Sequence, residues 1–214
     1  MALLQRSRIW SAVHEERQAL IDDLETLSPE RWNTPSLCPG WDVHDVVAHL
    51  VDTARTTRLG FLGRMAAAGF DFDKDNAAGV AMERAEDPRR TLGKFRAVLS
   101  RTTGPPAPLA TRLVEAFVHG EDIRRPLGIH REYPVMEVVE ALKLQVATST
   151  KMGGGRELVD GLRLVVSDAG LQHGQGPEVR GCATALLLAV SGRPVGPDEL
   201  SGPGVAELMA RLGS

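Results

Sequence analysis

Residues 40–50 have the sequence GWDVHDVVAHL, which predicts the beginning and the buried face of a helix. Asp42 is a typical N-cap residue, and Asp45 lies three residues later, near the positive end of the helix dipole. The buried stripe of this helix is predicted to consist of Val43, Val46, Val47 and Leu50. His49 lies inside the same apolar stretch, so its ring nitrogens need a partner in the interior of the protein.

Apolar residues at helical spacing predict further helices on both sides of this one. The expected ranges are 2–27, a helix that begins at Asp87 and Pro88, a helix from about 109 to Pro126, and 134–150. A short helical turn that carries Trp32 is expected after Ser28, where Pro29 follows an N-cap. Residues 69–86 are rich in Asp, Ala and Gly, and we interpret them as a mobile connection that could serve as a lid.

The pattern changes after the three glycines at residues 153–155. Leu162, Leu164 and Val166 alternate with their neighbours and predict a strand, followed by a turn at residues 168–170. Residues 183–190 and 205–212 predict two short helices. The sequence therefore predicts a mainly α protein, with a helical bundle in residues 1–152 and a small α+β domain in residues 156–214.

Composition excludes several classes of function. The 214 residues are 43% hydrophobic, with a net charge of −3 and scattered arginines, so no basic surface for nucleic acid is expected. The longest apolar run is too short to span a bilayer, and charged residues occupy the place of a signal-peptide core. Two cysteines in different contexts provide no disulfide framework. We expect a cytoplasmic protein without a membrane partner.

Glu115 and His119 lie four residues apart in the sequence VEAFVHGEDIRRPLG at residues 114–128, so a helix presents both on one face. With His49 from a facing helix they would form a three-ligand metal site, and helical bundles commonly hold metals in this way. Such a set leaves one open position on a tetrahedral zinc ion, as catalysis requires. Nickel or iron accept the same ligands. A solvated Glu-His pair and a hydrogen-bonded core histidine are the alternatives.

Four segments, GWDVHDVVAHL, VEAFVHGEDIRRPLG, GPEVRG at 176–181 and SGRP at 191–194, resemble the mycothiol-dependent maleylpyruvate isomerase family. The resemblance implies a DinB-like four-helix bundle followed by a small sterol-carrier-like domain. It also implies a metal triad at His49, Glu115 and His119, mycothiol as the thiol cofactor, and an actinobacterial type of protein. The implied reaction is isomerisation of a small electrophilic substrate, or transfer of the thiol to it.

Other polar residues near these motifs allow two interpretations each. Arg193 is a candidate for binding a carboxylate or the cofactor. Asp122 could orient His119 through a hydrogen bond, although an exposed position at the helix end is favoured. Arg124 is expected to complement the helix dipole, and His44 to lie on the surface. Cys38 precedes a helix and is a rival nucleophile to a bound thiol.

Two alternatives to a thiol-dependent enzyme remain open. The first is a non-catalytic bundle that binds a small molecule and carries a structural or vestigial metal. The second is a metal-dependent hydrolase, in which the open position takes an activated water. The partners expected for the enzyme are a small thiol and a small electrophile, and the protein is expected to be a monomer or a homodimer.

Overall fold

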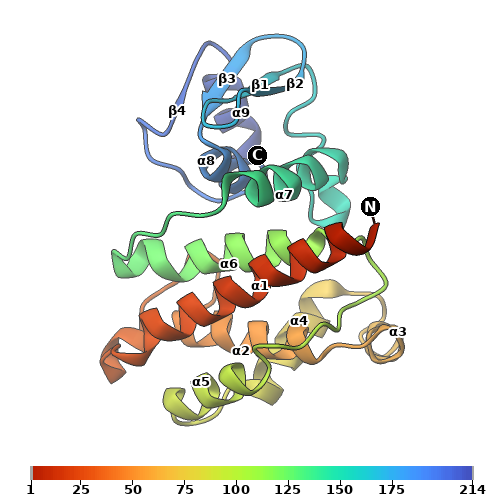
Figure 1. The fold of residues 1–214 in the computed structure, drawn as a ribbon, viewed down its shortest axis with the longest axis vertical. Coiled ribbons are helices and arrows are strands. Elements are labelled where there is room, and N and C mark those ends of the chain that lie inside the picture. Colours follow the sequence, from red (N-terminus) through yellow and green to blue (C-terminus); the bar gives the residue numbers. More distant parts are fainter. Residues whose placement is uncertain (1, 214) are drawn as a thin grey trace. The chain divides into compact units, whose positions relative to one another are not determined.

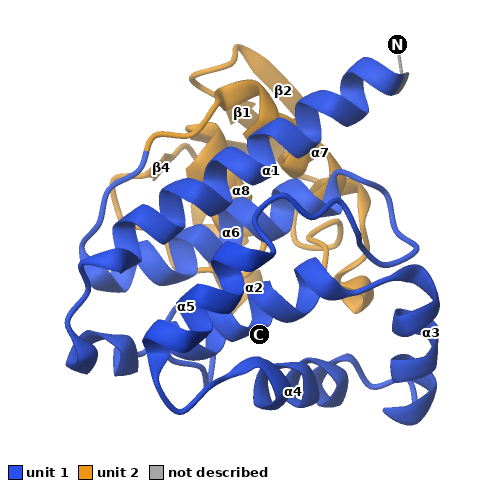
Figure 2. Cartoon of the chain, turned by 60° about the horizontal axis from the view of Figure 1, so that its bottom comes forward, with its two compact units in different colours: residues 1–131 blue, residues 132–214 orange. Residues whose placement is uncertain are grey.

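The computed structural model describes residues 2–213. The chain divides into two compact units, with the boundary between Arg131 and Glu132 (Figure 2). The predicted division at residues 153–155 lies instead within the second unit. The reason is that α7 (Val135–Ala147) packs against α8 (Ala183–Val190), so its contacts assign it to the second unit. Each unit is described by itself below.

The first unit is built around a four-helix bundle (Figure 1). Its helices are α1 (Ala2–Glu25), α2 (Val43–Arg55), α5 (Pro88–Ala97) and α6 (Thr111–Leu127). Helices α1 and α2 each contact both α5 and α6, which closes the bundle around one hydrophobic core. Trp32, from the short 3₁₀ helix η1 (Pro29–Asn33), and Phe95 are buried in this core. Apolar residues at helical spacing form a stripe that a helix turns towards such a core. The predicted bundle is confirmed.

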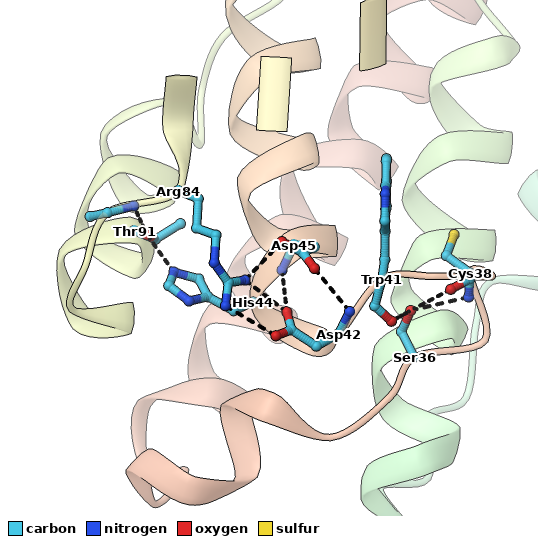
Figure 3. A network of polar contacts seen from close by, with 9 residues as sticks. Ser36, Cys38, Trp41, Asp42, His44, Asp45, Arg84 and Thr91 are labelled. Atoms are coloured by element: carbon cyan, nitrogen blue, oxygen red, sulfur yellow. Dashed lines mark hydrogen bonds and ion pairs between the residues drawn. The ribbon is translucent and has the colours of Figure 1, made fainter. Parts of the chain in front are cut away.

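Helix α2 begins with a complete capping box. The Asp42 side chain accepts from the Asp45 backbone amide at 2.8 Å, and the Asp45 side chain accepts from the Asp42 amide at 3.1 Å. Arg84 places Nη1 2.8 Å from a carboxylate oxygen of each aspartate (Figure 3). This arrangement fixes the beginning of the helix that carries His49.

The prediction of a mobile connection over residues 69–86 is wrong, because most of that range is helical. Helix α4 (Phe72–Glu83) follows α3 (Arg58–Ala67) and packs against α2. The close approach depends on Gly79, where a Cβ atom would lie 2.4 Å from Asp52 Oδ2. Arg64 then bridges the elements, since its Nη1 lies 2.6 Å from Asp52 Oδ1 and its Nε lies 2.8 Å from Asp75 Oδ1.

The second unit combines α7, α8 and α9 (Val205–Leu212) with a small sheet and a 3₁₀ turn, η2 (Thr150–Met152). The sheet has the order β2-β1-β3-β4. Its strands are β1 (Arg163–Val166), β2 (Leu171–Gly174), β3 (Glu178–Gly181) and β4 (Leu200–Ser201). Strand β1 is antiparallel to β2 and parallel to β3, and β4 is antiparallel to β3. The predicted strand, turn and two short helices are confirmed, and so is the fold class.

Among residues 2–213, no helix combines the length and the apolar character that crossing a membrane would require.

Candidate metal centre

His49 on α2 and His119 on α6 lie next to each other inside the first unit. Their ring centroids are 5.0 Å apart and the rings are nearly perpendicular, at 80°. His49 is 6% exposed, and within the described part of the chain its buried Nδ1 atom has no hydrogen-bond partner. The Trp41 ring lies 5.1 Å from His49 and contributes an aromatic wall. A buried ring nitrogen without a partner is costly unless a ligand satisfies it, so His49 fits a cation site.

The charge state of His49 also suits coordination. Burial lowers the pKa of His49 well below its ordinary value of 6.5, and the positive charges of His119 and Arg112 lower it further. The imidazole is therefore neutral, and a metal ligand must offer an unprotonated nitrogen.

Asp122 orients the second histidine. His119 Nδ1 lies 2.9 Å from Asp122 Oδ2, one turn further along α6, and Asp122 is fully buried. The predicted exposed position of Asp122 at the helix end is therefore wrong. Because Nδ1 is engaged by the carboxylate, Nε2 is the nitrogen that remains to bind a metal. Burial lowers the pKa of His119, but the hydrogen bonds to Asp122 and Cys38 outweigh it and raise the pKa to about 9. A metal ion would therefore displace a proton here.

Cys38 reaches the same carboxylate from the loop before α2. Its Sγ donates to Asp122 Oδ2 at 3.1 Å and lies 3.8 Å from His119 Nδ1. The backbone amide of Leu37 donates to the Asp122 carbonyl at 3.1 Å, which holds the loop against α6. Ser36 further fixes the loop, because its hydroxyl accepts from the Cys38 amide at 3.1 Å (Figure 3).

Cys38, His119 and Asp122 form a group of possible metal ligands whose donor atoms lie within 4.8 Å of one another. This group uses Nδ1 of His119, whereas a site shared with His49 would use Nε2. The sequence did not reveal it, because a loop cysteine 84 residues before Asp122 shares no spacing signal with α6. The i, i+3 spacing of His119 and Asp122 was the one available signal.

Glu115 lies one turn before His119 on α6, as predicted. Its Oε2 accepts from Arg112 Nη1 at 2.8 Å, and both side chains are largely buried. Within residues 2–213, the predicted triad does not form a group as close as that of Cys38, His119 and Asp122. The structure thus brings His49 and His119 together and pairs Glu115 with a cation.

Arg193 belongs to the second unit, in the segment after α8. Its Nη1 donates to the Ser191 carbonyl at 2.7 Å. A role of Arg193 in binding the cofactor stays a prediction. Arg180, from the other distal motif, pairs with Glu178 at 2.8 Å and is largely exposed.

The predicted surface position of His44 is wrong. It is 2% exposed, and its Nε2 lies 2.7 Å from Thr91 Oγ1 on α5 (Figure 3). Burial, with a smaller effect of Arg84, lowers the pKa of His44 to about 4. This histidine stabilises the packing of α2 against α5 and lies apart from the group around Asp122.

Part of the chain matches a known family. Residues 13–103, which include the C-terminal half of α1, η1 and α2 to α5, match the model of the mycothiol maleylpyruvate isomerase N-terminal domain. This range contains His49 and Cys38 and ends before α6.

Two curated relatives are uncharacterized proteins of Mycobacterium tuberculosis, from strains CDC 1551 and H37Rv. Each is 33% identical over 139 residues, a match that covers 51% of this chain and 54% of the relative. The chain thus spans about half the length of these relatives.

Two solved structures have a similar fold. They are crystal structures of a mycothiol-dependent maleylpyruvate isomerase and of a histidine-to-alanine mutant of it. Each has a TM-score of 0.65 and 16% sequence identity, with 92% of both chains covered. At this identity the comparison supports the fold.

Proposed function

We propose that this chain, whose residues 13–103 match the model of the mycothiol maleylpyruvate isomerase N-terminal domain, belongs to that family and is a divalent-metal-dependent enzyme that uses a small thiol as its cofactor. Zinc is the proposed ion and mycothiol the proposed thiol. The proposed reaction is isomerisation of a small electrophilic substrate or transfer of the thiol to it, in the cytoplasm.

The observation that carries this proposal is the pair of buried imidazoles. His49 has a neutral ring, and its Nδ1 has no partner within residues 2–213. The centroid of this ring lies 5.0 Å from that of His119, whose Nδ1 is held by Asp122. A carboxylate that engages one nitrogen of a ligating histidine is typical of metal sites, because it fixes the tautomer and the direction of the ring. His49, Glu115 and His119 would hold the ion, with Glu115 using the oxygen that Arg112 does not contact.

A bound divalent ion lowers the pKa of a thiol that coordinates it, and so supplies a thiolate at neutral pH. The protein's own residues prepare the position for it. The Trp41 ring beside His49 excludes water from one side, and the low pKa of His49 keeps its ring neutral. Arg112 places a positive charge beside Glu115, which limits the negative charge that the ligand set accumulates.

The test measures the metal content of the purified protein beside three single variants, His49→Ala, His119→Ala and Cys38→Ala. We expect stoichiometric metal in the wild type and in Cys38→Ala, and loss of metal in both histidine variants. Cys182→Ala is the matched control, since Cys182 is exposed and lies in the second unit. Absence of metal from the wild type would overturn the proposal.

The cofactor is tested separately by cobalt substitution. Addition of a small thiol is expected to produce a thiolate-to-cobalt charge-transfer band in wild type and in Cys38→Ala. A band that exists before any thiol is added, and that disappears in Cys38→Ala, would instead identify Cys38 as a ligand. Turnover of an ester or amide without added thiol would support a metal-dependent hydrolase.

A second candidate function follows from the group of Cys38, His119 and Asp122. Coordination by these three residues would make the metal structural, in a bundle that binds a small molecule without catalysing a reaction. The same variants distinguish the two candidates, because Cys38→Ala would then lose metal and His49→Ala would retain it.

A further inference from the structure

A cavity of about 370 Å³ lies in the first unit, next to the beginning of α6. Three segments line it: the first turns of α1, the residues at the start of α3, and the loop before α6. Its charged lining residues are Arg6, Arg58 and Arg112, and Trp10 also lines it. No aspartate or glutamate lines the cavity.

Arg112 is paired with Glu115, but the other two guanidinium groups are not balanced by acids. Neither Arg6 nor Arg58 has an ion-pair partner among residues 2–213, and both are exposed. Arg112 is 8% exposed and donates through Nη1 to Glu115 and, at 3.4 Å, through Nε to Thr111. Its remaining nitrogen, Nη2, has no partner in the described part of the chain. Arginines that line one cavity without a lining acid are typical of a site for a carboxylate or a phosphate group, because the planar fork matches two oxygens.

Trp10 gives an independent indication of a ligand. Its side chain is 6% exposed, and its buried Nε1–H has no acceptor within residues 2–213. Leaving a buried donor unsatisfied costs about 1–3 kcal/mol, and buried indole N–H groups usually have a partner. Because Trp10 lines the cavity, we expect an oxyanion bound there to accept from this N–H after a small movement of the side chains that cover it.

We propose that this cavity binds the carboxylate or phosphate group of a small molecule, with Arg6, Arg58, Arg112 and the indole N–H of Trp10 as donors. The site is separate from the histidine pair but shares Arg112 with Glu115. Binding requires neither a metal nor a thiol, so the proposal does not depend on the proposed function.

The test is isothermal titration of the 214-residue protein with inorganic phosphate and, separately, with succinate, at constant ionic strength. Saturable binding of one probe per chain is expected, and the tighter probe identifies the class of ligand. Loss of one charge-assisted contact should raise Kd roughly tenfold or more in Arg6→Gln and in Arg58→Gln. Trp10→Phe should also weaken binding, because it keeps an aromatic ring at this position but removes the N–H donor.

Two controls separate this proposal from nonspecific charge effects and from binding to a metal. Arg90→Gln removes an exposed arginine of α5 outside the cavity and should leave Kd unchanged. His49→Ala should also leave Kd unchanged, even if it loses metal. The proposal would be overturned by the absence of saturable binding with both probes, by unchanged affinity in Arg6→Gln and Arg58→Gln, or by loss of binding in His49→Ala.

Discussion

Replacing Arg124 with methionine is expected to destabilise the first unit severely. Arg124 is fully buried, with Nε 2.6 Å from Asp23 Oδ2 and Nη1 in a short ion pair with Glu16. Glu16 is itself 4% exposed, so the substitution leaves a carboxylate in the interior, and within residues 2–213 Arg131, 3.6 Å away, is the one cation that remains paired with it. Breaking a buried pair in this way costs about 3–5 kcal/mol, because the remaining charge is uncompensated.

The loss of stability caused by Arg124→Met should depend on pH. Burial, the largest influence, raises the pKa of Glu16 above its ordinary value of 4.5 even though Arg124 opposes this. Removing Arg124 raises the pKa of Glu16 further. Between pH 4.5 and this folded pKa, Glu16 is protonated in the folded protein and ionised in the unfolded chain. Stability then falls as pH rises from 4.5 towards the folded pKa, and the cost of Arg124→Met is smaller at pH 5 than at pH 8.

Urea unfolding at both pH values, followed by circular dichroism, measures this cost. The double variant Arg124→Met/Glu16→Met removes both partners and should recover much of the lost stability, because an apolar pair of similar volume avoids the buried charge. Arg96→Met is the control, with an expected cost below about 1 kcal/mol, because Arg96 and its partner Glu25 are both exposed. A cost of less than about 1 kcal/mol for Arg124→Met would refute the reasoning.

Three further changes have defined outcomes. Asp122→Asn should weaken metal binding by roughly 10–100-fold in a chelator competition, because His119 loses its anionic partner, and unchanged affinity would contradict this. Gly79→Ala should lower the free energy of unfolding in urea by about 1–3 kcal/mol, since its Cβ would lie 2.4 Å from Asp52 Oδ2, and a neutral effect would show that α4 can shift. The pKa of His44 is about 4 in the folded protein against an ordinary value of 6.5, so folding favours the neutral ring. The contribution of His44 to the free energy of unfolding is therefore complete above pH 6.5 and is lost as pH falls towards 4. At pH 4.5 this loss is about 2–3 kcal/mol, and it should be absent in His44→Gln; identical pH slopes for the two proteins would exclude His44 as the cause.

Local signals in the sequence predicted most of the helices well. The capping pattern at Asp42 and Asp45 marked the beginning of α2, and Pro126 with Gly128 marked the end of α6, where Gly128 has a φ of 67°. These features depend on residues within one turn of each other, so they are visible in a single sequence. The placement of His49 inside α2 and of His119 inside α6 followed from the same periodicity.

The sequence could not show which charged residues are buried. Arg124 was interpreted as complementing the helix dipole, but its partner Glu16 lies 108 residues earlier on α1. Asp122 was expected at an exposed helix end because spacing alone does not reveal that the loop carrying Cys38 covers it. The helix α4 was missed because its apolar residues form no stripe at helical spacing, and its place depends on Gly79 and on ion pairs with distant residues. Such partners are defined only by the tertiary structure.

Helix α6 carries the proposed ligands Glu115 and His119, the orienting Asp122 and the buried Arg124 within 17 residues. Each residue added to or removed from a helix rotates everything beyond it by about 100°. An insertion between Glu115 and Arg124 would therefore turn the ligands and the ion pair out of register together, whereas the segment between Gly128 and Pro134 can change length without this effect. In related proteins that keep the metal site, α6 should accumulate substitutions but no insertions or deletions, and length variation should concentrate after Gly128.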